Sequence, residues 1–150
     1  MQRAGVVGLG DMGSGLAKNL ILNGFETTGL DLSEARMNAF VKLGGKPART
    51  IAEVGTNSDA VYVMVMNGDQ AKAVILGEEG LISHMPKGGA IILTATIKPS
   101  EAREIGVAMA GSGISLIDSP VSGGFPGAQG GTLTMMAAGE PSVLDAYKPV

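Results

Sequence analysis

Three glycines near the start of the chain are spaced as they are in loops that bind a pyrophosphate. The segment reads Gly8-Leu9-Gly10-Asp11-Met12-Gly13 and matches the pattern G-x-G-x-x-G. In such a loop Gly8 permits the tight turn, Gly10 lets the backbone approach the phosphates, and Gly13 lets a helix pack closely on a strand. The unpaired N–H groups at the start of that helix then face the anion. The alternative is a tight strand–helix turn that binds no ligand.

The neighbours of this loop bear on the phosphate interpretation. Ser14 stands where the P-loop pattern G-x-x-x-x-G-K requires a lysine, which excludes that class of loop. Asp11 places a carboxylate near the expected phosphates, and we expect it to point outward and cap the helix instead. The loop follows an apolar run and opens a helical pattern, which is the context that a dinucleotide site requires.

A carboxylate follows at the distance expected for the ribose of a dinucleotide. Asp31 lies 18 residues after Gly13, at the end of a second predicted strand, and Leu32 follows it. A carboxylate here accepts hydrogen bonds from the adenosine ribose and repels a 2′-phosphate. Leu32 offers no guanidinium to hold such a phosphate, so the sequence predicts NAD, with NADP disfavoured. The alternative is that Asp31 only starts a turn before the next helix.

A second glycine-rich segment follows a later predicted strand and reads Asp118-Ser119-Pro120-Val121-Ser122-Gly123-Gly124. The backbone N–H groups of Gly123 and Gly124 could form an anion-binding nest, with the Ser122 hydroxyl as a further donor. At the carboxyl end of a strand such a nest would face the cofactor crevice. A flexible connector is the alternative.

Together these segments resemble the β-hydroxyacid dehydrogenase family, which includes 3-hydroxyisobutyrate, tartronate semialdehyde and 6-phosphogluconate dehydrogenases. The resemblance covers the whole chain and is carried by Gly8–Gly13, Asp118–Gly124 and Gly131–Met135. Residues 65–67 and 71–74 look closest to the sugar-acid branch, which includes L-threonate dehydrogenase.

The resemblance implies roles for particular residues. The substrate carboxylate would bind to Ser122, Gly123 and Gly124. Further cofactor contacts would come from the segments after two other strands, with Thr96 beside the nicotinamide and Met66 and Asn67 on the far side of the cofactor.

The resemblance also implies a part that residues 1–150 do not contain. Family members carry a catalytic lysine in a glycine-rich helix after the cofactor domain, then an all-helical domain through which they usually assemble. Lys148 precedes that region and lacks the flanking glycines. We therefore expect residues 1–150 to be the dinucleotide-binding domain of a longer, homo-oligomeric parent. That parent would oxidise a hydroxyl β to a carboxylate and pass hydride to NAD, whereas the domain alone would catalyse little or nothing.

Short apolar runs alternate with helical patterns along the chain. Strands are predicted over residues 4–9, 27–31, 60–65, 90–93, 115–118 and 132–137. Helices are predicted over residues 12–23, 33–43, 68–76 and 99–110, with a short one after Thr50 and a last one near Pro141. Ser33 and Thr50 are the expected N-caps of the helices that follow them. This alternation predicts a Rossmann-type, doubly wound α/β fold with a mainly parallel sheet and helices on both faces.

Composition narrows the class of function. The formal net charge is −3, and no run of Lys or Arg offers the basic surface that nucleic acids require. No apolar stretch approaches the roughly 20 residues that span a bilayer. We therefore expect no membrane partner, and we expect the protein to be cytoplasmic. The chain has no cysteine and no cluster of ligands at metal-binding spacing, so we expect no metal site. The methionines at positions 64, 66, 135 and 136 are expected to fill the core.

Two other functions share a similar first loop. A non-catalytic nucleotide-sensing module can have the same fold, because a fold does not fix a function. A methyltransferase would bind S-adenosylmethionine instead of NAD, and the segment Asp118–Gly124 argues against it. A serine hydrolase is not favoured because the G-x-S-x-G pattern is missing.

Overall fold

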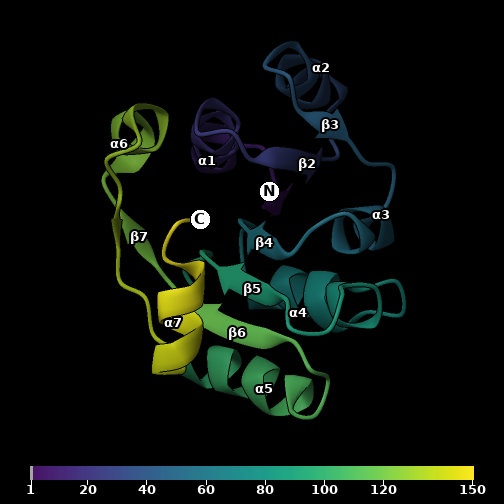
Figure 1. The fold of residues 1–150 in the computed structure, drawn as a ribbon. Coiled ribbons are helices and arrows are strands. Elements are labelled where there is room, and N and C mark those ends of the chain that lie inside the picture. The colour runs from purple at the N-terminus through teal and green to yellow at the C-terminus, as the bar shows by residue number, and fades with distance from the viewer. Residues whose placement is uncertain (1) are drawn as a thin grey trace.

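Six parallel strands form the central sheet of the computed structural model, which describes residues 2–150 (Figure 1). The strands lie in the order β3-β2-β1-β4-β5-β6. Their bounds are Arg3–Val7 (β1), Glu26–Leu30 (β2), Lys46–Pro47 (β3), Ala60–Val63 (β4), Ala90–Leu93 (β5) and Ser115–Asp118 (β6). The order reverses between β1 and β4, and ligands of open α/β sheets bind beyond the carboxyl ends of the strands at such a point.

Helices cover both faces of the sheet (Figure 1). One face carries α1 (Asp11–Leu22), α2 (Glu34–Lys42) and α7 (Pro141–Tyr147). The other carries α3 (Ile51–Thr56), α4 (Gly68–Leu76), α5 (Pro99–Met109) and the short 3₁₀ helix η1 (Leu81–Ser83). The predicted Rossmann-type, doubly wound fold is therefore confirmed.

The central strands β4 and β5 are apolar throughout because both of their faces are buried. In β4, Val61 and Val63 belong to the core under α3, α4 and α5, whereas Ala60 and Tyr62 belong to the core under α1 and α2. Successive side chains of a strand point to opposite faces, so a parallel strand covered on both sides needs apolar residues at every position.

The chain after β6 differs from the prediction. The strand predicted over residues 132–137 does not join the main sheet. Instead β7 (Val121–Ser122) and β8 (Thr134–Met135) form a separate antiparallel pair. A short helix, α6 (Gly124–Gly130), occupies the place where a glycine-rich loop was expected.

Two features explain this departure. Gly123 and Gly124 have φ angles of 135° and 60°, a backbone conformation that other residues rarely adopt, and they turn the chain away from the sheet. The helix α6 then packs on α1, where a Cβ added to Gly15 would lie 2.5 Å from the carbonyl carbon of Ala128.

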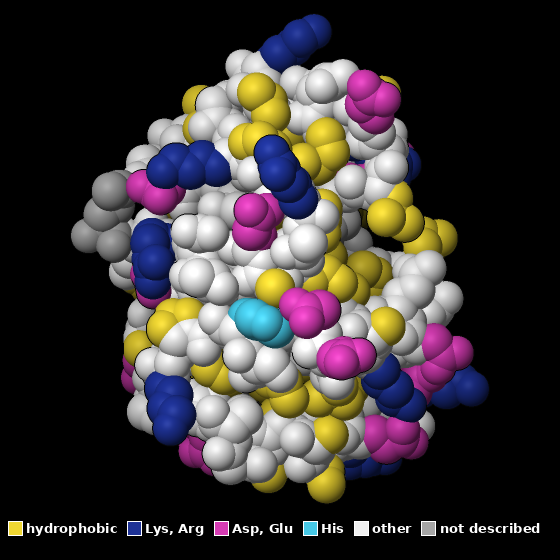
Figure 2. Space-filling view, turned by 90° about the vertical axis from the view of Figure 1, so that its right-hand side faces the viewer, with side chains coloured by type: hydrophobic (Ala, Val, Ile, Leu, Met, Phe, Trp, Pro, Cys, Tyr) yellow, Lys and Arg dark blue, Asp and Glu magenta, His cyan; other side chains and the backbone are white. Residues whose placement is uncertain are grey.

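The surface is mixed in charge and carries more methionine than expected. On the face in Figure 2, basic and acidic side chains are interspersed rather than gathered by sign. The expectation that the methionines fill the core is wrong for Met66, Met135 and Met136, which are 84%, 38% and 52% exposed. Within residues 2–150, no helix has the length and apolar character needed to cross a membrane.

Candidate functional site

The residues singled out from the sequence lie beyond the carboxyl ends of the strands. Residues 8–10 link β1 to α1, and Asp31 and Leu32 directly follow β2. The remaining candidates follow the strands on the other side of β1: Met66 and Asn67 after β4, Thr96 after β5, and Ser122, Gly123 and Gly124 after β6. Because these strands are parallel, their carboxyl ends share one edge of the sheet, so all of these loops start from that edge.

Contacts within the protein require two of the three loop glycines. Gly8 has a φ of +95°, and a Cβ there would lie 2.0 Å from the carbonyl oxygen of Met64, at the end of β4. A Cβ at Gly13 would lie 1.7 Å from the carbonyl oxygen of Gly8. Both distances are far inside van der Waals contact with rigid backbone, so the turn between β1 and α1 closes only around glycine.

Gly10 differs from the other two glycines of the loop, Gly8 and Gly13. Its φ of −68° is open to any residue, and a Cβ there would come no closer than 3.8 Å to another residue, namely the guanidinium of Arg36. The fold itself therefore gives no reason for glycine at this position. A close approach by a ligand is the reason that the sequence pattern suggests.

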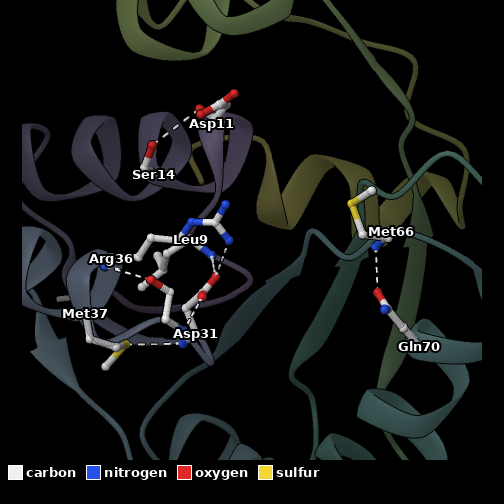
Figure 3. A network of polar contacts seen from close by, with 9 residues as sticks. Leu9, Asp11, Ser14, Asp31, Arg36, Met37, Met66 and Gln70 are labelled. Carbon is white, nitrogen blue, oxygen red and sulfur yellow. Dashed lines mark hydrogen bonds and ion pairs between the residues drawn. The ribbon is translucent and has the colours of Figure 1, made fainter.

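The start of α1 offers its backbone N–H groups. Gly10 is the N-cap residue, and within the described chain no side chain accepts a hydrogen bond from the first turn. The first bond of the helix runs from the N–H of Ser14 to the carbonyl oxygen of Gly10, at 2.8 Å. Asp11 points outward as expected, because its side chain is exposed and lies apart from Asp31 (Figure 3). The expectation that it caps the helix is wrong, because Asp11 is already the first helical residue.

Asp31 joins the phosphate-type loop to the helix after β2 (Figure 3). Its Oδ2 accepts a 2.7 Å hydrogen bond from the N–H of Leu9, and its Oδ1 accepts one of 2.8 Å from the N–H of Ser33. The side chain is only 9% exposed. The turn that was the alternative reading of Asp31 is therefore present, and each carboxylate oxygen keeps further acceptor capacity for a ribose hydroxyl.

Sequence reasoning missed Arg36. This residue lies in the first turn of α2, and its Nη1 is 3.6 Å from Oδ2 of Asp31. The sequence pattern indicated no guanidinium for a 2′-phosphate because Leu32, which is fully exposed, follows Asp31. A guanidinium is nevertheless present, because Arg36 in α2 lies four residues after Leu32. The predicted cap at Ser33 was the available signal, because it places Arg36 one turn from Asp31.

The segments after β4 and β5 show which contacts hold the other candidates. Asn67 is the N-cap of α4, and its Oδ1 accepts a 2.9 Å hydrogen bond from the N–H of Gln70. The N–H of Met66 donates to Oε1 of the same glutamine at 2.8 Å (Figure 3). Thr96 is exposed, whereas the buried Thr94 donates from Oγ1 to the carbonyl oxygen of Val63 and ties β5 to β4.

The segment after β6 is built around its glycines. Ser122, Gly123 and Gly124 are all exposed, and Ser122 pairs with Thr134 in the small antiparallel sheet. Burial raises the pKa of the Asp118 carboxyl, at the end of β6, above its usual range. This segment reaches the neighbourhood of the first loop through α6, which packs on α1.

Comparisons with known proteins agree with this arrangement. Residues 3–150 match the NAD-binding domain of 6-phosphogluconate dehydrogenase, and the chain belongs to that family. The resemblance to β-hydroxyacid dehydrogenases is thereby confirmed, and the chain is a NAD-binding domain of the type found in hydroxyacid dehydrogenases.

Individual relatives are dehydrogenases of small acids. The chain is 38% identical to an L-threonate dehydrogenase of Cupriavidus necator over 135 residues, which is 90% of this chain and 46% of that protein. It is 32% identical to an NAD-dependent L-serine dehydrogenase of Pseudomonas aeruginosa, over 100% of this chain and 50% of that protein. The structure of a 3-hydroxyisobutyrate dehydrogenase from Salmonella typhimurium superposes with a TM-score of 0.93 at 31% identity, covering 99% of this chain and 52% of that one. The chain thus spans about half the length of the curated relatives it matches.

Proposed function

We propose that this domain holds NAD for a dehydrogenase that acts on a small β-hydroxy acid. One observation carries the proposal: at the uncapped start of α1, Gly10 is the loop glycine that the fold does not require. Glycine at such a position lets phosphate oxygens approach the backbone N–H groups. When bound, NAD supplies the hydride acceptor of the reaction.

The pyrophosphate would bind to residues 8–13, and Asp31 would receive the adenosine ribose. Asp31 is already oriented by the N–H groups of Leu9 and Ser33, so a ribose hydroxyl would meet a fixed carboxylate. Leu32 adds an exposed apolar surface next to it. Such preorganisation lowers the entropic cost of binding.

The nicotinamide and the substrate would lie beyond β4, β5 and β6. We propose Thr96 beside the nicotinamide, and Met66 and Asn67 on the far side of the cofactor. Ser122, Gly123 and Gly124 would bind the substrate carboxylate, and their exposure leaves the Ser122 hydroxyl free to donate. A sugar acid is the preferred substrate class, since a relative at 38% identity is an L-threonate dehydrogenase.

The acid–base group for the hydroxyl would come from a longer parent protein. We propose that the parent adds a lysine-bearing helix and an all-helical domain to residues 1–150. The domain alone would then bind cofactor without turning over a hydroxy acid.

The test is a calorimetric titration of the chain with NADH, in comparison with the Gly10→Ala variant. We expect wild type to bind and Gly10→Ala to bind at least about tenfold more weakly, because the added methyl meets the ligand. The matched control is Gly106→Ala in α5, where the nearest atom to the new Cβ is 3.7 Å away. Equal binding by all three proteins, or no binding by wild type, would overturn the proposal.

A further inference from the structure

The last strand of the chain has one edge without a partner. β8 pairs only with β7, in a two-stranded antiparallel sheet. The pairing continues past β8, because the N–H of Met136 donates to the carbonyl oxygen of Pro120 at 3.0 Å and Ala138 exchanges two hydrogen bonds with the end of β6. The backbone groups of Met135 and Ala137 alternate with these and point the other way. In the described part of the chain, no second strand or loop pairs with them on that side.

This open edge of β8, formed by residues 133–137, is apolar and uncharged. No acidic or basic residue occurs from Gln129 to Gly139. The side chains of Met135 and Met136 lie on opposite faces of the strand and are 38% and 52% exposed. On the side of Met135, a groove of about 230 Å³ lies between the strand and α1 and is lined mostly by apolar residues. An exposed apolar edge of this kind pairs with another strand unless something protects it.

The main sheet ends at an edge that is protected. Its edge strand β3 has only two residues, Lys46 and Pro47. Lys46 forms a 2.7 Å ion pair with Glu26, and proline has no N–H to donate to a further strand. The open edge of β8 contains neither a charge nor a proline. The contrast indicates that the edge of β3 excludes another strand and that the edge of β8 accepts one.

We propose that the open edge of β8 binds a second copy of this chain. The two β8 strands pair antiparallel across a two-fold axis and form a four-stranded sheet in the order β7-β8-β8-β7. An antiparallel edge is complementary to itself, because each N–H meets a C=O of the same segment in the other copy. With the axis beside Met135, this residue faces Met135 of the second copy.

Charge favours a second copy over a charged partner strand. A basic or acidic strand would find no counter-charge on this edge, whereas two uncharged edges approach without repulsion and pack their methionines together. The contact is short, and interfaces that bury less than about 1,200 Å² are weak. We therefore expect a dissociation constant of about 10–100 µM. In this dimer the two β7 strands, each with a Ser122, lie three strand spacings apart, which is roughly 14 Å.

The oligomeric state of the 150-residue chain tests the proposal by sedimentation equilibrium at concentrations from about 5 to 500 µM, which bracket the expected dissociation constant. Wild type should show a monomer–dimer equilibrium. Met136→Lys brings two like charges near the axis, and Ala137→Pro removes an outward N–H, so each should weaken the dimer at least about tenfold. The matched control is Val107→Lys, which replaces a side chain of α5 that is 77% exposed and should leave the equilibrium within about twofold of wild type. Thermal unfolding of each variant verifies that the fold is kept.

Amide hydrogen exchange locates the contact within the chain. The N–H groups of Met135 and Ala137 should exchange more slowly in wild type as the protein concentration rises, because they become hydrogen bonded only in the dimer. None of the substituted residues belongs to the proposed cofactor site, so a failure of this inference leaves the proposed function untouched.

Three outcomes would overturn the inference. A wild type that stays monomeric at every concentration would leave the edge to another occupant, such as a segment of a longer parent. A dimer that survives both Met136→Lys and Ala137→Pro, or that Val107→Lys weakens equally, would mean that the copies meet elsewhere. Assemblies that keep growing with concentration would mean open-ended pairing instead of a closed two-fold dimer.

Discussion

The backbone N–H of Leu9 donates a 2.7 Å hydrogen bond to Oδ2 of Asp31, and this bond fixes the loop after β1 to the end of β2. The second oxygen of the same carboxylate receives the N–H of Ser33 at the start of α2. One side chain therefore orders the glycine loop and also presents the carboxylate proposed for the ribose. The structural and the functional interpretations of Asp31 are compatible, and their effects can be measured apart.

Replacement of Asp31 should affect both stability and binding. Asp31→Ala leaves two N–H groups without their charged acceptor, so we expect the free energy of unfolding to fall by about 1–3 kcal/mol. NADH binding should weaken as well. Asp31→Asn keeps the size of the side chain and one acceptor oxygen, so it should lose less stability. Urea unfolding and calorimetric titration measure the two effects, and an Asp31→Ala protein as stable as wild type would contradict the structural part.

The loop glycines should divide into two groups. Gly8→Ala and Gly13→Ala each place a methyl about 2 Å from a backbone carbonyl oxygen, so we expect each to destabilise the chain by about 3 kcal/mol or more. The free energy of unfolding of Gly10→Ala should lie within about 0.5 kcal/mol of the wild-type value, because neither a steric clash nor the backbone conformation opposes alanine there. Thermal and urea unfolding distinguish the groups. A Gly10→Ala protein as unstable as Gly13→Ala would mean that the fold, and not a ligand, requires Gly10.

The Arg3–Asp59 ion pair should influence how the free energy of unfolding falls at acid pH. The hydrogen bond from Arg3 lowers the pKa of Asp59. A carboxyl whose pKa is lower in the folded than in the unfolded chain stabilises the fold above its unfolded pKa, and this contribution is lost as the pH falls through the folded pKa. Asp59→Asn should therefore lower the free energy of unfolding at pH 7 by no more than about 1 kcal/mol, since the pair is partly exposed. Below about pH 4 the free energy of unfolding of this variant should fall less steeply than that of wild type.

The matched control for this prediction is Asp145→Asn, which removes one carboxylate from an exposed position in α7. Urea unfolding from pH 7 to pH 2.5 provides the comparison. If Asp145→Asn reduced the loss of stability at acid pH as much as Asp59→Asn does, the effect would come from net charge and not from the pair with Arg3.

Local signals were enough to predict most of the sheet and its helices. The strand over residues 90–93 is a short apolar run, and the helix over residues 68–76 ends at a glycine, so each could be placed to the residue. Ser33 and Thr50 cap the helices after them as predicted, because their hydroxyls accept N–H groups three residues further on. Such interactions span few residues and are therefore visible in the sequence.

What the sequence did not reveal depends on contacts between distant segments. Four of the seven residues of Gly124–Gly130 are glycine or proline, a composition that disfavours a helix, yet the segment is helical where it packs on α1. Arg36 reaches the ribose end only because α2 lies beside the first loop. The edge strand β3, Lys46–Pro47, has too few residues to leave a pattern.

The contact between α1 and α6 gives a prediction whose sign is informative. Glycine inside a helix is normally less favourable than alanine by about 1 kcal/mol, so Gly→Ala usually stabilises. At Gly15 the new methyl would lie 2.5–2.7 Å from atoms of Ala128, so we expect Gly15→Ala to displace α6 and to destabilise the chain by about 1–3 kcal/mol. Gly106→Ala in α5 has room for its methyl and should be neutral or stabilising by up to about 1 kcal/mol.

Urea unfolding compares the two variants, and a stabilised Gly15→Ala protein would show that α6 does not dock on α1 as described. Since α6 directly follows Ser122 and Gly123, its displacement should also disturb the segment proposed for the substrate carboxylate, while NADH binding at the first loop is retained.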